Sequence, residues 1–205
     1  MTPEYWKQAK RTLARRDPVM HGIMKQYPRI ALVGRGDPFT TLARSIVGQQ
    51  ISVKAAQTVW QRIVEAVPEM TPAAVSRHGA RRLARCGLSQ RKADYFVDLA
   101  RHFTKGLLRE DAWRDMDDEA VIEDLVQVHG IGRWTAEMFL MFNLLRSDVL
   151  PLDDIGLQRA VSLYYFEGER VDAAQIRKLA EIWSPWRSVA TWYLWRSLDP
   201  VPVVY

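Results

Sequence analysis

The chain has 205 residues, of which 48% are hydrophobic and 26% are charged, a balance that is typical of a soluble globular protein and excludes a disordered one. Its formal net charge of +5 suits a polyanionic partner, either nucleic acid or a membrane surface, without proving one. The single cysteine excludes an intrachain disulfide, a cysteine-ligated iron–sulfur cluster and a cysteine-rich zinc site, and the four histidines show no metal-ligand spacing.

In the first half of the chain, a polar capping residue precedes each of several helical segments, and proline often follows it at the first turn. The predicted helix starts are Thr2–Pro3, Asp37–Pro38, Ser52, Thr71–Pro72 and Ser89. Gly87 is the predicted end of the helix that precedes the last of these starts.

The second half of the chain keeps the helical spacing of apolar residues. Helices are predicted around residues 121–126 and over residues 133–145, 157–165, 173–183 and 186–198. A short alternating run at residues 201–205 is the one candidate strand, and Pro202 interrupts it. The pattern therefore predicts an all-α fold. We expect a single domain over residues 1–205, with two helical lobes and a cleft between them. Residues 38–145 would form the central lobe, and residues 1–37 with 146–205 the second.

Gly130 and Gly132 flank Ile131 between two predicted helices. A turn this short needs backbone angles that glycine adopts readily. It also exposes main-chain N–H groups at the start of the next helix, where they and the helix dipole favour an anion. Arg133 and Thr135 would add donors beside a phosphate. The hairpin therefore predicts contact with a DNA backbone, and a plain interhelical turn is the alternative.

The same hairpin offers three carbonyl oxygens to a cation. Those of Val126, Val128 and Ile131 could coordinate a monovalent ion that bridges to phosphate. We expect Na⁺ or K⁺ there when DNA is bound, and no required cofactor.

Four segments together resemble the helix–hairpin–helix (HhH-GPD) superfamily of DNA glycosylases. They are residues 46–52, 87–93, the hairpin with residues 150–154, and residues 183–188. The most similar branch is DNA-3-methyladenine glycosylase II. The resemblance implies a monofunctional hydrolase that flips alkylated purines, such as 3-methyladenine and 7-methylguanine, out of duplex DNA. It would hydrolyse the N-glycosidic bond and so initiate base excision repair.

Asp153 and Asp154 compete for the catalytic role. In the superfamily a basic residue follows the catalytic aspartate by five positions, a frame that Asp154 fits with Arg159. Asp153 would then cap the helix. A fixed carboxylate stabilises the positive charge that develops on the sugar as the bond breaks. Lyase-type relatives carry a lysine in the second helix of the hairpin, where this chain has Trp134, so no lyase activity is expected.

The resemblance also implies a pocket for the flipped base. Two aromatic positions of the family match Trp134 and Trp195, whereas two others are Met138 and Ile155 here. This less aromatic pocket leaves the order of preference among damaged bases open.

A wedge residue would fill the space that the flipped base leaves in the duplex. The family places it near the Gly-Gln-Gln segment, so Val47 and Gln49 are the candidates. A buried loop whose glutamine amides tie backbone groups together is the alternative interpretation.

Two other functions stay open, a non-catalytic helix–hairpin–helix DNA-binding module and a glycosylase for oxidised or mismatched bases. A pure binder needs no carboxylate facing the DNA, and the missing lysine and cysteine cluster disfavour the commonest oxidised-base enzymes. The expected partner is damaged double-stranded DNA. No apolar run approaches the ~20 residues of a membrane span. We expect a cytoplasmic monomer, nucleoid-associated in a bacterium or archaeon, and a nuclear one in a eukaryote.

Overall fold

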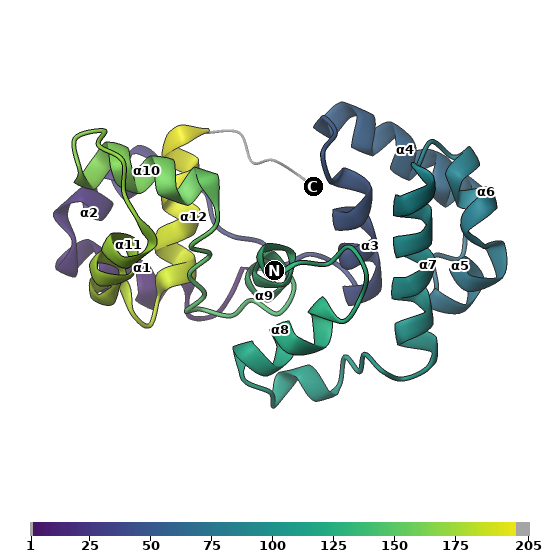
Figure 1. The fold of residues 1–205 in the computed structure, drawn as a ribbon. Helices are drawn as coiled ribbons and strands as arrows, with labels where there is room; N and C mark the ends of the chain where they lie inside the picture. Colours follow the sequence, from purple (N-terminus) through teal and green to yellow (C-terminus); the bar gives the residue numbers. More distant parts are fainter. Residues whose placement is uncertain (1, 200–205) are drawn as a thin grey trace. The chain divides into compact units, whose positions relative to one another are not determined.

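The structure is a computed structural model that describes residues 2–199 (Figure 1). Within this range it contains twelve α-helices, two 3₁₀ helices and no strand, which confirms the all-α prediction. The candidate strand at residues 201–205 lies outside the described residues. The described chain divides into two compact units, residues 2–34 with 140–199 and residues 35–139.

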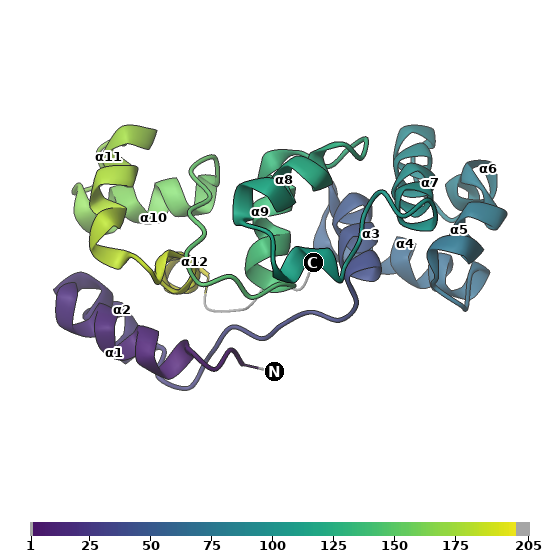
Figure 2. The ribbon, with the colours of Figure 1, turned by 90° about the horizontal axis from the view of Figure 1, so that it is seen from below.

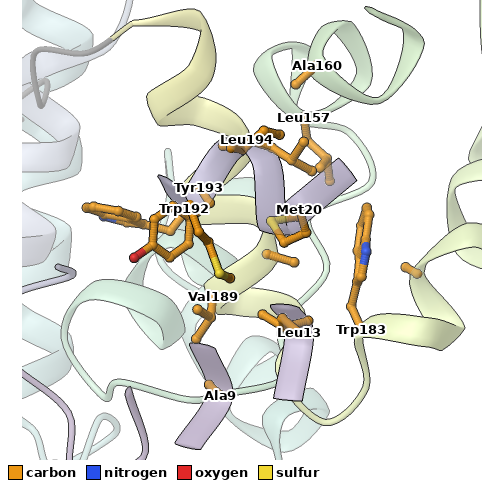
Figure 3. Close-up of a cluster of buried hydrophobic side chains, with 14 of the residues drawn as sticks. Ala9, Leu13, Met20, Leu157, Ala160, Trp183, Val189, Trp192, Tyr193 and Leu194 are labelled. Atoms are coloured by element: carbon orange, nitrogen blue, oxygen red, sulfur yellow. The ribbon is translucent and has the colours of Figure 1, made fainter. Parts of the chain in front are cut away.

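The first unit is built from helices at both ends of the chain. They are α1 (Trp6–Arg16), α2 (Pro18–Gln26), α10 (Ile155–Tyr165), α11 (Ala173–Leu179), the 3₁₀ helix η2 (Ala180–Trp183) and α12 (Arg187–Leu198). Their apolar side chains meet in one core, where Leu13, Leu157 and Tyr193 are fully buried (Figure 3). Residues 188–194 of α12 are all buried, so this helix runs through the core of the unit.

Asp17 links three elements of this unit through a buried carboxylate that is 2% exposed. It caps α2 by accepting the Met20 N–H at 3.0 Å, and its other oxygen accepts from Tyr165 Oη at 2.6 Å and Trp183 Nε1 at 2.8 Å. These donors compensate the loss of water around the charge. The Asp17–Pro18 start was absent from the predicted starts although it has the same pattern as Asp37–Pro38.

The second unit contains most of the remaining helices. They are α3 (Pro38–Gly48), α4 (Val53–Ala66), α5 (Pro72–His78), α6 (Ala80–Arg85), α7 (Gln90–Thr104), the 3₁₀ helix η1 (Ala112–Arg114) and α8 (Asp118–Val126), followed by α9 (Arg133–Phe142), which ends in the first unit. Figure 2 shows α5 and α6 beside α7. Trp113 of η1 is fully buried against Phe103 and Phe139, with ring centroids 6.1 and 5.2 Å away.

The helix starts test the sequence patterns one by one. The prediction at Thr2 is wrong: α1 begins at Trp6, because the Trp6 N–H donates to the Pro3 carbonyl at 3.0 Å in a turn that precedes the helix. The other predicted caps are confirmed, since each accepts a backbone N–H three residues on: Asp37, Ser52, Thr71 and Ser89. Between residues 2 and 199, no helix has the length and apolarity that crossing a membrane requires.

Candidate functional site

The turn between α8 and α9 needs glycine at one of its two glycine positions. Gly130 has φ +85°, and a Cβ there would lie 2.2 Å from Cδ2 of Tyr95. The φ of Gly132 lies outside the left-handed region, and a Cβ added there would meet open space. The expectation that the turn requires both glycines is therefore wrong at this position. Its missing side chain instead leaves the backbone accessible to a ligand. Ile131, 4% exposed, packs inward as expected.

Asp98 of α7 holds the hairpin from the side. One of its oxygens accepts the His129 backbone N–H at 2.9 Å and lies 2.8 Å from Nδ1 of the same residue. Burial opposes ionisation of this carboxyl, but the two hydrogen bonds from His129 and the electrostatic effects of His102 and His129 together outweigh it and lower the pKa of Asp98. Because the pKa is lowered, the contact contributes its full stability above the ordinary carboxyl pKa. This contribution is lost as the pH falls through the lowered pKa. The hairpin is therefore held in place at neutral pH.

The two side chains that were predicted to donate to a phosphate are either ion-paired or buried. The Arg133 guanidinium donates to Glu119 through both terminal nitrogens and to Glu137 at 3.1 Å, and the hydrogen bond with Glu119 raises the pKa of Arg133 further. Thr135 is only 7% exposed, so its side chain faces the interior. The structure thus differs from the expectation that both side chains stand beside a phosphate. The exposed backbone around Gly132 is the remaining candidate for contact with an anion.

The loop between α3 and α4 is fastened to this hairpin. Val47 is 1% exposed, and its carbonyl accepts from Nζ of Lys92 at 2.9 Å. Lys92 donates to the Gln49 carbonyl as well, and Gln49 Nε2 donates to the Gly130 carbonyl at 2.8 Å. Desolvation lowers the pKa of Lys92. Val47 is therefore too buried to act as the predicted wedge, and Gln49 matches the alternative in which its amide ties backbone groups together.

Gln50, which sequence reasoning missed, is one of three consecutive exposed residues of this loop, residues 50–52. Its φ of +57° is unusual for a residue with a side chain. It borders an open hollow of about 670 Å³ that is also lined by Arg91, Tyr95 and Gly130. No pattern in the sequence distinguishes Gln50 from Gln49, because the turn alone decides which side chain points outward.

Asp154 is held by two donors at the start of α10. Its Oδ1 accepts the Leu157 N–H at 2.6 Å and the Trp195 Nε1–H at 2.7 Å. Asp154 is therefore itself the N-cap, and the prediction that Asp153 caps the helix is wrong because the exposed Asp153 stands one residue too early. The arrangement fixes one oxygen of a half-buried anion in a defined direction.

The predicted pocket residues are placed as follows. Trp195 stacks on Phe142, a residue the sequence did not single out, with centroids 5.9 Å apart and ring planes at 17°. Ile155 is 79% exposed directly after the carboxylate. Trp134, 38% exposed, and the half-buried Met138 lie one turn apart on α9. The structure thus brings Trp195 into contact with Asp154 and puts Trp134 and Met138 on one helix face.

Gly156 allows the contact between the indole and the carboxylate. A Cβ at this position would lie 3.0 Å from Cδ1 of Trp195 and 3.1 Å from Oδ1 of Asp154. Both distances are tighter than most contacts of a Cβ, so a side chain here would require the indole or the carboxylate to shift by a few tenths of an ångström.

Comparison with known proteins identifies relatives across most of the chain. The family described as HhH-GPD superfamily base excision DNA repair protein matches residues 43–185. DNA-3-methyladenine glycosylase 1 of Schizosaccharomyces pombe is 33% identical over 166 residues, which cover 78% of this chain and 72% of that protein. This chain spans about two thirds of the length of the first curated relatives it matches.

Two solved structures extend the likeness to the fold. DNA-3-methyladenine glycosidase from Bacillus halodurans superposes with a TM-score of 0.82 at 33% identity, over 92% of this chain and 87% of its own. The S. pombe 3-methyladenine DNA glycosylase in complex with abasic DNA also gives 0.82, at 28% identity over 97% and 99%. The family match over residues 43–185 includes both the hairpin and Asp154.

Proposed function

Because the chain belongs to the HhH-GPD superfamily of base excision DNA repair proteins, we propose that it is a monofunctional DNA glycosylase for alkylated purines. It takes 3-methyladenine, 7-methylguanine and similar bases from duplex DNA and leaves an abasic site. The observation that carries the proposal is the Asp154 carboxylate, oriented by Leu157 and Trp195 in a chain that also contains the hairpin.

The chemistry requires little besides that carboxylate. An alkylated purine is cationic and leaves readily once flipped out of the stack. As the glycosidic bond breaks, the sugar gains oxocarbenium character, and the Asp154 anion stabilises a charge that exists only in the transition state. The same carboxylate orients or deprotonates the attacking water. The hydrogen bonds that fix its Oδ1 remove the cost of reorienting it during the reaction.

The base pocket in this proposal is lined by Trp134, Met138, Ile155 and Trp195. An aromatic face attracts an electron-poor, cationic base by roughly 1–2 kcal/mol once water is excluded. The indole N–H of Trp195 is already donated to Asp154, which links base recognition to the catalytic group. Ile155 offers an exposed apolar side chain beside that group.

The hairpin binds the DNA backbone in this proposal. The N–H groups around Gly132 meet a phosphate, helped by the positive end of α9. A monovalent cation on the carbonyls of Val126, Val128 and Ile131 would add a hard, oxygen-only bridge to the same phosphate. The turn that carries these carbonyls is held in a fixed shape, because the Ile131 N–H donates to the Val128 carbonyl at 3.1 Å and Asp98 fixes the residue between Val128 and Gly130.

The test of the function is base release from methylated duplex DNA. We expect free methylpurine in solution and a DNA strand that breaks only after alkali treatment. Strand breakage without alkali would contradict the monofunctional assignment. Tight binding with no release of any alkylated purine would favour the non-catalytic DNA-binding module instead.

We propose Gln50 as the wedge in place of Val47. Gln50→Gly removes the side chain yet keeps the φ of +57° accessible, so the loop should retain its shape. We expect roughly tenfold less flipping, followed by the fluorescence of 2-aminopurine placed beside a lesion, with unchanged thermal stability. Gln50→Asn, which also tolerates this φ, is the matched control and should retain part of the signal. Full flipping in Gln50→Gly would assign the wedge elsewhere.

Gly156→Ala should slow base release through the contact between Trp195 and Asp154. The added Cβ displaces the indole from the carboxylate, and losing a hydrogen bond to a charged group costs about 1.5–3 kcal/mol. The single-turnover rate should therefore fall roughly tenfold to a hundredfold. Gly22→Ala, in α2 with nothing within 4 Å of the new Cβ, is the control and should keep the full rate. A normal rate in folded Gly156→Ala protein would contradict this role.

A further inference from the structure

The catalytic unit contains an open pocket beside the helix that begins at Asp154. It has a volume of about 420 Å³ and lies between α10 and the segment that leads into α11. Its lining includes Ile155, Arg159 and Ser162 from the helix, and Arg170 and Asp172 from the segment. All of these residues belong to one unit of the structure.

The two arginines of this pocket are not neutralised by the protein. Neither guanidinium forms an ion pair or a hydrogen bond with any residue from 2 to 199. Elsewhere in the same unit, Arg187 is held by Asp148 through bonds of 2.8 and 2.6 Å. Asp172 is the only acidic residue in the pocket lining, and its Oδ1 accepts from the N–H of Gln175 to cap α11. The pocket thus presents two unpaired cations.

The position of the pocket relates it to the reacting nucleotide. Ile155 follows Asp154 directly, lines the pocket and is 79% exposed. Arg159 lies five residues beyond Asp154, about 7.5 Å further in rise along α10. A strand whose sugar sits at Asp154 in the proposed function would lie beside the open pocket that begins at Ile155 and includes Arg159.

We infer that this pocket binds a backbone phosphate of the damaged strand next to the flipped nucleotide, through Arg159 and Arg170. The inference rests on the proposed function, because that function puts the damaged strand at Asp154. Planar guanidinium groups suit phosphate oxygens by paired hydrogen bonds. The contact is separate from the hairpin, and it holds the lesion-bearing strand while the base leaves.

The test is the salt dependence of binding for the variant that carries both Arg159→Gln and Arg170→Gln. Its affinity is measured by fluorescence anisotropy on a duplex with a stable abasic-site analogue and on an undamaged duplex. Loss of one phosphate contact lowers the slope of log K against log salt by roughly 0.9. We expect this drop on the abasic-analogue duplex and an unchanged slope on undamaged DNA. Arg177→Gln, on α11 and outside the pocket lining, is the matched control.

A second probe identifies the phosphate directly. Neutral methylphosphonate replaces one phosphate at a time on either side of the abasic analogue. At the contacted position, the difference in binding affinity between the intact protein and the double variant should disappear. An unchanged slope in the double variant, or an equal loss on undamaged DNA, would overturn the inference. Methylpurine release by the intact protein tests the proposed function independently. A failure of the proposed function is therefore distinguishable from a failure of the phosphate-binding inference.

Discussion

Asp154→Asn is expected to abolish methylpurine release while DNA binding persists. Asparagine keeps an oxygen that can accept from Leu157 and Trp195, so the cap and the orientation of the side chain are retained. What is lost is the negative charge opposite the developing oxocarbenium ion. Removing one preorganised electrostatic group of this kind costs roughly a hundredfold to a thousandfold in rate. Single-turnover release of methylpurine measures the loss, and anisotropy on abasic-analogue DNA measures the retained binding.

Asp153→Asn is the matched control because the neighbouring carboxylate is exposed and caps nothing. Its rate should equal that of the unmodified protein. If Asp153→Asn loses activity and Asp154→Asn keeps it, the catalytic role belongs to Asp153. Thermal unfolding of both variants distinguishes a chemical defect from a folding defect.

Gly130→Ala should disrupt the hairpin and with it the grip on DNA. The new Cβ would lie 2.2 Å from the ring of Tyr95, and φ of +85° is unfavourable for alanine. The left-handed conformation costs roughly 1–2 kcal/mol and overpacking roughly 1–3 kcal/mol more. We expect a clearly lower melting temperature and DNA affinity reduced at least tenfold. Differential scanning calorimetry and anisotropy provide the two measurements.

Gly132→Ala tests the neighbouring glycine on different grounds. Position 132 has no unusual φ and open space around the new Cβ, so stability should be unaffected. Lower DNA affinity in this variant would then report how closely the phosphate approaches the backbone. For Gly130→Ala, adding Tyr95→Ala should recover the steric part of the loss and leave the backbone part. Wild-type stability in Gly130→Ala alone would contradict the geometry of the turn.

Most helix caps were predictable from neighbours in sequence, although the local pattern misplaced the caps at Thr2 and Asp153 and missed Asp17. Features set by distant residues were not predictable. The caps at Asp37, Ser52 and Ser89 each serve an N–H three residues away, so local pattern suffices. Asp154 was predicted to be the catalytic residue from the hairpin, the loop and the superfamily's spacing to Arg159, and this stays a prediction. By contrast, Trp195 meets Asp154 across 41 positions of the chain.

The hairpin shows the same limit. The sequence predicted that Arg133 binds a phosphate, but in the structure its guanidinium donates to Glu119, 14 residues earlier. Val47, a wedge candidate from the sequence, is buried, and its carbonyl accepts from Lys92, 45 residues away. Long-range hydrogen bonds of this kind depend on how helices pack, and a single sequence does not reveal the packing.

The hydrogen bond from Gln49 to the Gly130 carbonyl has a consequence for how damage is found. A repair enzyme must sample very many intact base pairs for each lesion. Here the loop that carries Gln50 is hydrogen-bonded to the turn that binds a phosphate in the proposed function. In that function, binding of the turn to a phosphate places Gln50 against the base stack. Holding the strand and inspecting it are then coupled, and weakly stacked, damaged pairs open first.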